Sequence, residues 1–75
     1  MRVHTTRELG GLVRDRRDRL GLTQQQAADR AAVTREWLVR FENGKATVPL
    51  ARVLDLLTAL GLVLDVVVDG KQADA

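Results

Sequence analysis

Residues 62–68 change from a helical period to the two-residue period of a β-strand, and we find no other such segment in the chain. One face of this segment is entirely apolar and consists of Leu62, Leu64, Val66 and Val68. The other face carries Asp65 between two valines, and β-branched residues favour a β-strand. Because we find no second strand pattern, the backbone N–H and C=O groups of this strand would lack partners within one chain.

A second copy of the chain is the simplest partner for this strand. Two copies would form an antiparallel ribbon about a two-fold axis, packed on the helices. An axis centred on Asp65 would place two carboxylates opposite each other, so we expect it nearer Leu64 or Val66. The alternative is a short fifth helix packed inside the monomer.

Four helical stretches precede the strand. The first is expected to begin at Thr5 and the second at Thr23, each with a capping box. The third spans residues 35–42, and the fourth runs from near Pro49 to Gly61. The buried stripe of the fourth helix is predicted to be Leu50, Val53, Leu54, Leu57 and Leu60. The adjacent glycines at positions 10 and 11 predict fraying at the start of the first helix.

Length and composition exclude several classes of protein. A chain of 75 residues forms one domain at most, and it contains no Cys, no Ser, no Tyr and a single His, at position 4. These absences argue against an enzyme, a disulfide framework, a metal site or a bound cofactor. The apolar runs are too short to cross a bilayer, and the first residues lack a signal-peptide pattern. We therefore expect a cytoplasmic protein.

The basic residues are concentrated before position 46. The chain has 12 basic and 10 acidic residues for a net charge of +2, and ten of the basic residues are arginine. A basic, helical first half is typical of a nucleic-acid-binding domain. A solvated surface of salt bridges is the alternative, because Asp15 and Asp18 lie among these arginines.

The second and third helices are separated by a turn of three residues, which is a helix-turn-helix layout. The second helix of such a motif places its N-terminal side chains in the major groove of DNA. Arg35, Glu36 and Arg40 fall on its outer side. Arginine suits the guanine edge and glutamate can accept from cytosine, although Glu36 could instead pair with Arg40 on the helix surface.

Three motifs resemble the lambda-repressor-like, Xre-type DNA-binding domain over residues 8–61. They are LTQQQAA at 22–28, VTR at 33–35 and FENGK at 41–45. The resemblance implies phosphate contacts from the start of the second helix and from Lys45, and base contacts from the start of the third. The predicted DNA-contacting residues are Gln24, Gln25, Thr34, Arg35, Glu36, Arg40 and Lys45.

The resemblance also implies that Arg17 forms a structural ion pair with Glu42. Two positions depart from the family pattern. The usual turn glycine is Ala32, which predicts strain of about 1 kcal/mol or another backbone path. The usual large apolar residue of the second helix is Ala27, leaving space that Trp37 or a residue of the first helix could fill. Trp37 could instead contact a sugar or a thymine methyl group.

The strand after Gly61 makes the chain most similar to HipB-type antitoxins, whose strands pair between protomers. The predicted organisation is a flexible arm (1–4), a four-helix DNA-binding domain (5–61), a dimerising strand (62–68) and a polar tail (69–75). This resemblance implies a homodimeric transcriptional repressor that binds a palindromic operator of double-stranded DNA and neutralises a HipA-like kinase toxin. The alternatives are a plain, phage-like Xre repressor and a protein-interaction module that does not bind DNA alone.

Overall fold

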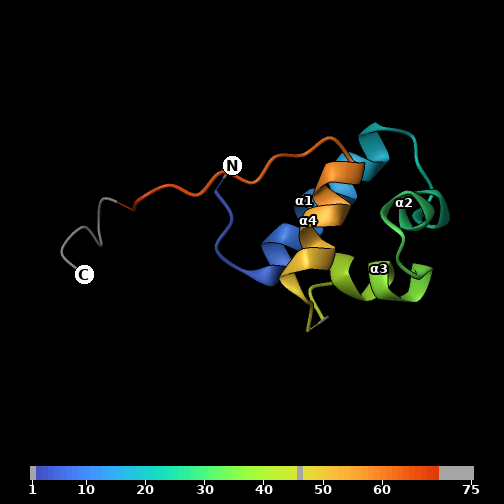
Figure 1. The fold of residues 1–75 in the computed structure, drawn as a ribbon, viewed down its shortest axis with the longest axis horizontal. Helices are drawn as coiled ribbons and strands as arrows, with labels where there is room; N and C mark the ends of the chain where they lie inside the picture. Colours follow the sequence, from blue (N-terminus) through green and yellow to red (C-terminus); the bar gives the residue numbers. More distant parts are fainter. Residues whose placement is uncertain (1, 46, 70–75) are drawn as a thin grey trace.

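The computed structural model describes residues 2–45 and 47–69, where four α-helices precede an extended C-terminal segment (Figure 1). Their bounds are α1 (Thr6–Arg19), α2 (Gln24–Ala31), α3 (Arg35–Glu42) and α4 (Leu50–Ala59). This confirms the predicted mostly helical class. None of the helices in these residues has the length and hydropathy that a bilayer crossing needs.

Threonine side chains fix three of the four helix starts. The hydroxyl oxygens of Thr5, Thr23 and Thr34 each accept a hydrogen bond from the backbone N–H three residues later. The predicted starts of the first two helices are therefore confirmed. In α1, however, the Glu8 carboxylate accepts from the backbone N–H of His4 at 3.0 Å, one residue before the cap.

The core forms where α2 packs against α3 and α4 and where α1 packs against α3. Its buried apolar residues are Val13, Ala27, Ala28, Ala31, Leu38, Phe41, Val53, Leu56, Leu57 and Leu60. The predicted stripe of α4 was wrong at Leu50 and Leu54, which are 64% and 40% exposed, and it omitted Leu56, which is fully buried. Leucines lie on both sides of this helix, so periodicity alone did not fix which side faces α2.

Gly10 permits the close approach of α1 to α3. Helix α1 is continuous through both glycines rather than frayed. A Cβ atom at Gly10 would overlap the backbone carbonyl oxygen of Phe41, whereas one at Gly11 would meet nothing within 4 Å. Gly10 therefore serves helix packing, which outweighs its low helix propensity.

In the turn between α2 and α3, Ala32 adopts a backbone conformation that usually requires glycine. Ala32 has φ 57° and ψ 40°, the left-handed conformation, and is the one non-glycine residue with positive φ among those the structure describes. The next amide, that of Val33, donates to the carbonyl of Ala28 at 3.0 Å. Of the two predicted outcomes, the strained path is the one adopted.

The C-terminal segment leaves α4 in a defined direction. Gly61 has φ 71°, and the amide of Leu62 donates to the carbonyl of Leu57 at 2.8 Å. Arg16 of α1 donates through Nε to the carbonyl of Leu60 at 2.9 Å. Residues 62–69 then run as an extended stretch (Figure 1), so the alternative of a fifth helix does not form there. Strand pairing between two copies stays a prediction.

Candidate nucleic-acid interface

Helix α3 exposes one face whose polar side chains have no partner among the residues that the structure describes. Leu38, Phe41 and Glu42 are buried on the opposite face. Arg35, Glu36 and Arg40 are exposed, and within residues 2–45 and 47–69 their side chains make no hydrogen bond or ion pair. The alternative pairing of Glu36 with Arg40 is therefore absent from this structure, and all three side chains are available to a ligand.

A buried network holds this face relative to the other helices. The Arg17 guanidinium donates through Nε to Glu42 Oε2 at 2.7 Å and through Nη2 to Oε1 at 3.1 Å. Its Nη1 donates to the carbonyl of Leu22 at 3.0 Å. Arg17 and Glu42 are 8% and 7% exposed. Hydrogen bonding to the Glu42 carboxylate raises the pKa of Arg17, so the guanidinium stays charged at every ordinary pH.

Gln24 belongs to the same network. Its Nε2 donates to Glu42 Oε1 at 3.2 Å, so one carboxylate links α1, α2 and α3. A side-chain amide has two N–H donors, and the second is left for a ligand such as a phosphate. This contact is one that motif comparison did not predict.

The remaining predicted contact residues lie around α2 and α3. Gln25 is exposed on α2, and its Nε2 donates to Asp29 Oδ1 at 2.9 Å. A DNA contact from Gln25 would use the second N–H of this amide or break the bond to Asp29. Thr34 caps α3 and is exposed. Lys45 is exposed after α3, and its backbone N–H donates to the carbonyl of Arg40 at 2.9 Å. The structure thus places the predicted residues at the starts of α2 and α3, on the exposed face of α3 and directly after it.

Trp37 packs against the core and stacks on its neighbour Phe41. Its ring lies parallel to that of Phe41, with centroids 5.2 Å apart and planes 4° apart. It is only partly buried, and it also lines a shallow hollow with Glu36 and Arg40. Thr34 and Thr47 complete the lining. Thr47 lies on the loop before α4 and carried no signal in the sequence analysis.

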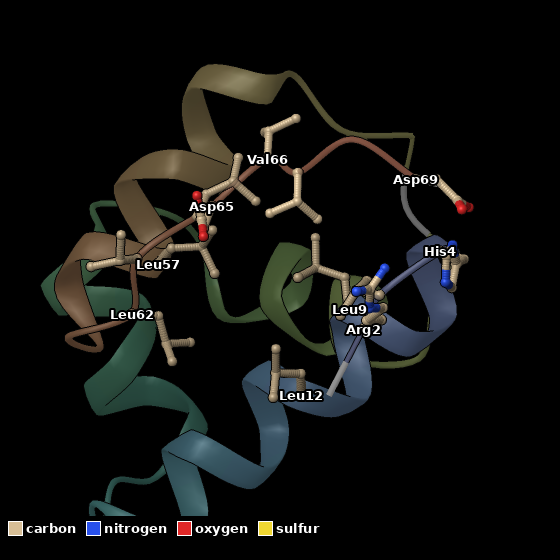
Figure 2. A pocket seen from close by; sticks show the side chains of 13 residues that line it. Arg2, His4, Leu9, Leu12, Leu57, Leu62, Asp65, Val66 and Asp69 are labelled. Carbon is tan, nitrogen blue, oxygen red and sulfur yellow. The ribbon is translucent and has the colours of Figure 1, made fainter. Parts of the chain in front are cut away.

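A second surface feature is an apolar groove between the N-terminal residues, α1 and the C-terminal segment. Figure 2 shows Leu9 and Leu12 of α1 facing this groove together with Leu57 and Val66. Several side chains of residues 62–68 are strongly exposed, and Val66 is 85% exposed. A contiguous exposed apolar surface of this kind is typical of a protein interface.

The relatives found by comparison with known proteins are helix-turn-helix proteins. A helix-turn-helix domain family model matches residues 8–69. The chain is 34% identical over 71 residues to y4mF of Sinorhizobium fredii, named an uncharacterized HTH-type transcriptional regulator; the match spans 95% of this chain and 93% of that one. It is 38% identical over 50 residues to another HTH-type transcriptional regulator, from Methanothermobacter thermautotrophicus, with 67% and 72% covered.

Solved structures share the fold. The structure of a HipA-HipB-O2-O3 complex contains a chain with a TM-score of 0.80 at 19% identity, covering 89% of this chain and 94% of that one. The restriction-modification controller protein C.AhdI from Aeromonas hydrophila gives a TM-score of 0.73 at 29% identity, covering 77% and 84%. The chain therefore belongs to the Xre-like helix-turn-helix family and has a HipB-like fold.

Proposed function

We propose that this protein is a sequence-specific DNA-binding transcriptional repressor that acts as a homodimer. The observation that carries the proposal is the outer face of α3, where Arg35, Glu36 and Arg40 are exposed and unpaired. Side chains of these types suit guanine and cytosine edges in the major groove. The Arg17–Glu42–Gln24 network supports the proposal, because it holds α2 and α3 in one orientation relative to α1.

Dimerisation follows from the exposed apolar C-terminal segment. Pairing of residues 62–68 between two copies would satisfy the backbone groups of the segment and cover its apolar side chains. A dimer would present two copies of α3 to half-sites about one helical turn apart. A palindromic operator is the matching target.

The experiment that tests repression is a fluorescence-anisotropy titration at two salt concentrations. It compares the DNA upstream of the protein's own coding sequence with a scrambled duplex of equal length. A large specificity ratio that persists at the higher salt is expected of an autoregulating repressor. Equal, salt-sensitive binding would reveal contacts to phosphates only, and no binding would favour the protein-interaction module.

We further propose that the repressor is the antitoxin of a HipA/HipB-type pair. The HipB-like fold and the extended segment after α4 support this role. The role predicts a HipA-like kinase gene beside the coding sequence and relief of kinase-induced growth arrest when this chain is co-expressed. Failure to relieve the arrest would contradict it.

The second candidate is a plain regulator without a toxin partner. The similarity to the controller protein C.AhdI, at 29% identity, favours it. A coding sequence with no kinase gene beside it, combined with specific binding to the upstream DNA, would decide for this candidate.

A further inference from the structure

The hollow beside Trp37 lies between two surfaces with different expected roles. It is lined by Thr34, Glu36, Trp37 and Arg40 from the start and middle of α3, and by Thr47 from the loop that leads to α4. The outer face of α3 is the proposed base-reading surface. The loop that supplies Thr47 follows the motif that contains the predicted phosphate contact Lys45. The hollow is therefore at the border between the bases and the sugar-phosphate backbone of a bound duplex.

Trp37 presents a free donor at this border. Its indole N–H makes no hydrogen bond in the described residues, and no buried side-chain nitrogen or oxygen there lacks a partner. The indole N–H must therefore be open to solvent. Stacking on Phe41 and contact with the core hold the ring in place at the edge of the hollow.

The chemistry of the lining favours an acceptor as ligand. An indole nitrogen only donates, hydroxyl groups can donate, and the Arg40 guanidinium donates and is cationic. Glu36 supplies the one carboxylate of the lining. Phosphate oxygens occur at every nucleotide and accept from such groups, and most protein–DNA hydrogen bonds go to phosphate and sugar.

We propose that this hollow binds one phosphate of the DNA backbone, with the indole N–H of Trp37 and the hydroxyl of Thr47 as its neutral donors. The site rests on the proposed DNA-binding function and adds to it a contact beside the base-reading residues. It would fix the depth at which α3 enters the groove without selecting a base.

The test compares variants on a duplex that the intact chain selects from a random-sequence pool and on an unrelated duplex of equal length. Trp37→Phe keeps an aromatic ring to stack on Phe41 and removes the N–H, and Thr47→Val removes a hydroxyl at nearly constant shape. Thr58→Val is the matched control, because Thr58 is exposed on α4 outside this hollow. Thermal melts establish that all variants are folded.

We expect Trp37→Phe and Thr47→Val each to weaken binding roughly tenfold on both duplexes, which leaves the specificity ratio unchanged, as loss of a bond to a charged phosphate requires. Thr58→Val should bind like the original chain. One methylphosphonate position in the selected duplex should weaken the original chain but not weaken Trp37→Phe further.

Three results would overturn the site. Unchanged affinity of Trp37→Phe would remove it while leaving the DNA-binding function intact. Trp37→Phe could instead lose affinity only for duplexes with thymine at one position. If replacing that thymine with deoxyuridine weakens binding of the original chain equally, Trp37 contacts the thymine methyl group and not a phosphate. Failure of the original chain to select any duplex from the pool would refute the proposed function together with the site.

Discussion

Glu42 accepts two hydrogen bonds from the guanidinium of Arg17 and one from the amide of Gln24, so a single buried carboxylate joins three helices. Both ends of the ion pair are removed from water, and the desolvation cost is offset only while the partner is present. The pair therefore controls both stability and the orientation of the motif.

Removal of one partner of this pair should be costly. Arg17→Met leaves the Glu42 carboxylate buried without its cation and is expected to lower the free energy of unfolding by about 3–5 kcal/mol. The double variant Arg17→Met/Glu42→Leu should recover much of that loss, because neither charge remains. Urea denaturation measures both. A double variant no more stable than the single one would contradict the account.

The two adjacent glycines of α1 should respond in opposite directions to the same substitution. Gly10→Ala places a methyl group against the carbonyl of Phe41 and is expected to cost about 1–3 kcal/mol through overpacking. Gly11→Ala meets open space and should stabilise by up to about 1 kcal/mol through helix propensity. Thermal melts measure both effects, and each variant serves as the control for the other. Equal effects would exclude the proposed α1–α3 contact.

Because Ala32 has a left-handed conformation in the turn, glycine at this position is expected to stabilise the fold. Ala32→Gly should raise the free energy of unfolding by about 1 kcal/mol, since glycine adopts φ 57° without steric cost. Ala31→Gly, one residue earlier in the regular helix, should instead destabilise. Chemical denaturation of both distinguishes turn strain from a general effect of glycine. A destabilised Ala32→Gly would indicate a different turn conformation in solution.

The C-terminal segment should determine the oligomeric state. Val66→Asp introduces a charge into the apolar face predicted to pair between copies, and we expect monomers with much weaker operator binding. Truncation after Gly61 should act in the same way. Val63→Asp, on the opposite face and already exposed, is the matched control. Light scattering that finds a dimer after truncation would refute pairing through this segment.

Substitution of a base-contacting residue should change sequence preference, whereas substitution of a phosphate-contacting residue should lower the affinity for every sequence. Arg35→Ala should relax preference at one base pair at a cost of about 1–3 kcal/mol. Lys45→Ala should weaken binding to all sequences alike and reduce the slope of log affinity against log salt by about one. Titrations at several salt concentrations on selected and unrelated duplexes separate the two. An Arg35→Ala variant with full affinity and preference would rule out the assignment of the recognition helix.

Local sequence chemistry determined the helix starts and the helix-turn-helix layout. A threonine directly before a helical pattern, with Glu or Gln three residues later, is a short-range signal, and Thr5 and Thr23 cap their helices as predicted. At Ala32 the family pattern left two backbone paths open, and the structure decided for the left-handed one. The helix starts depend on neighbours within four residues.

Tertiary packing decided what periodicity left open. The buried side of α4 was set by contact with α2, which selected Leu56 over Leu54 although both are leucine. Gly10 was assigned a cost from propensity, whereas its value lies in contact with a carbonyl on another helix. The bond from Gln24 to Glu42 and the hollow that includes Thr47 join residues distant in the chain, and no local pattern encodes which distant groups meet.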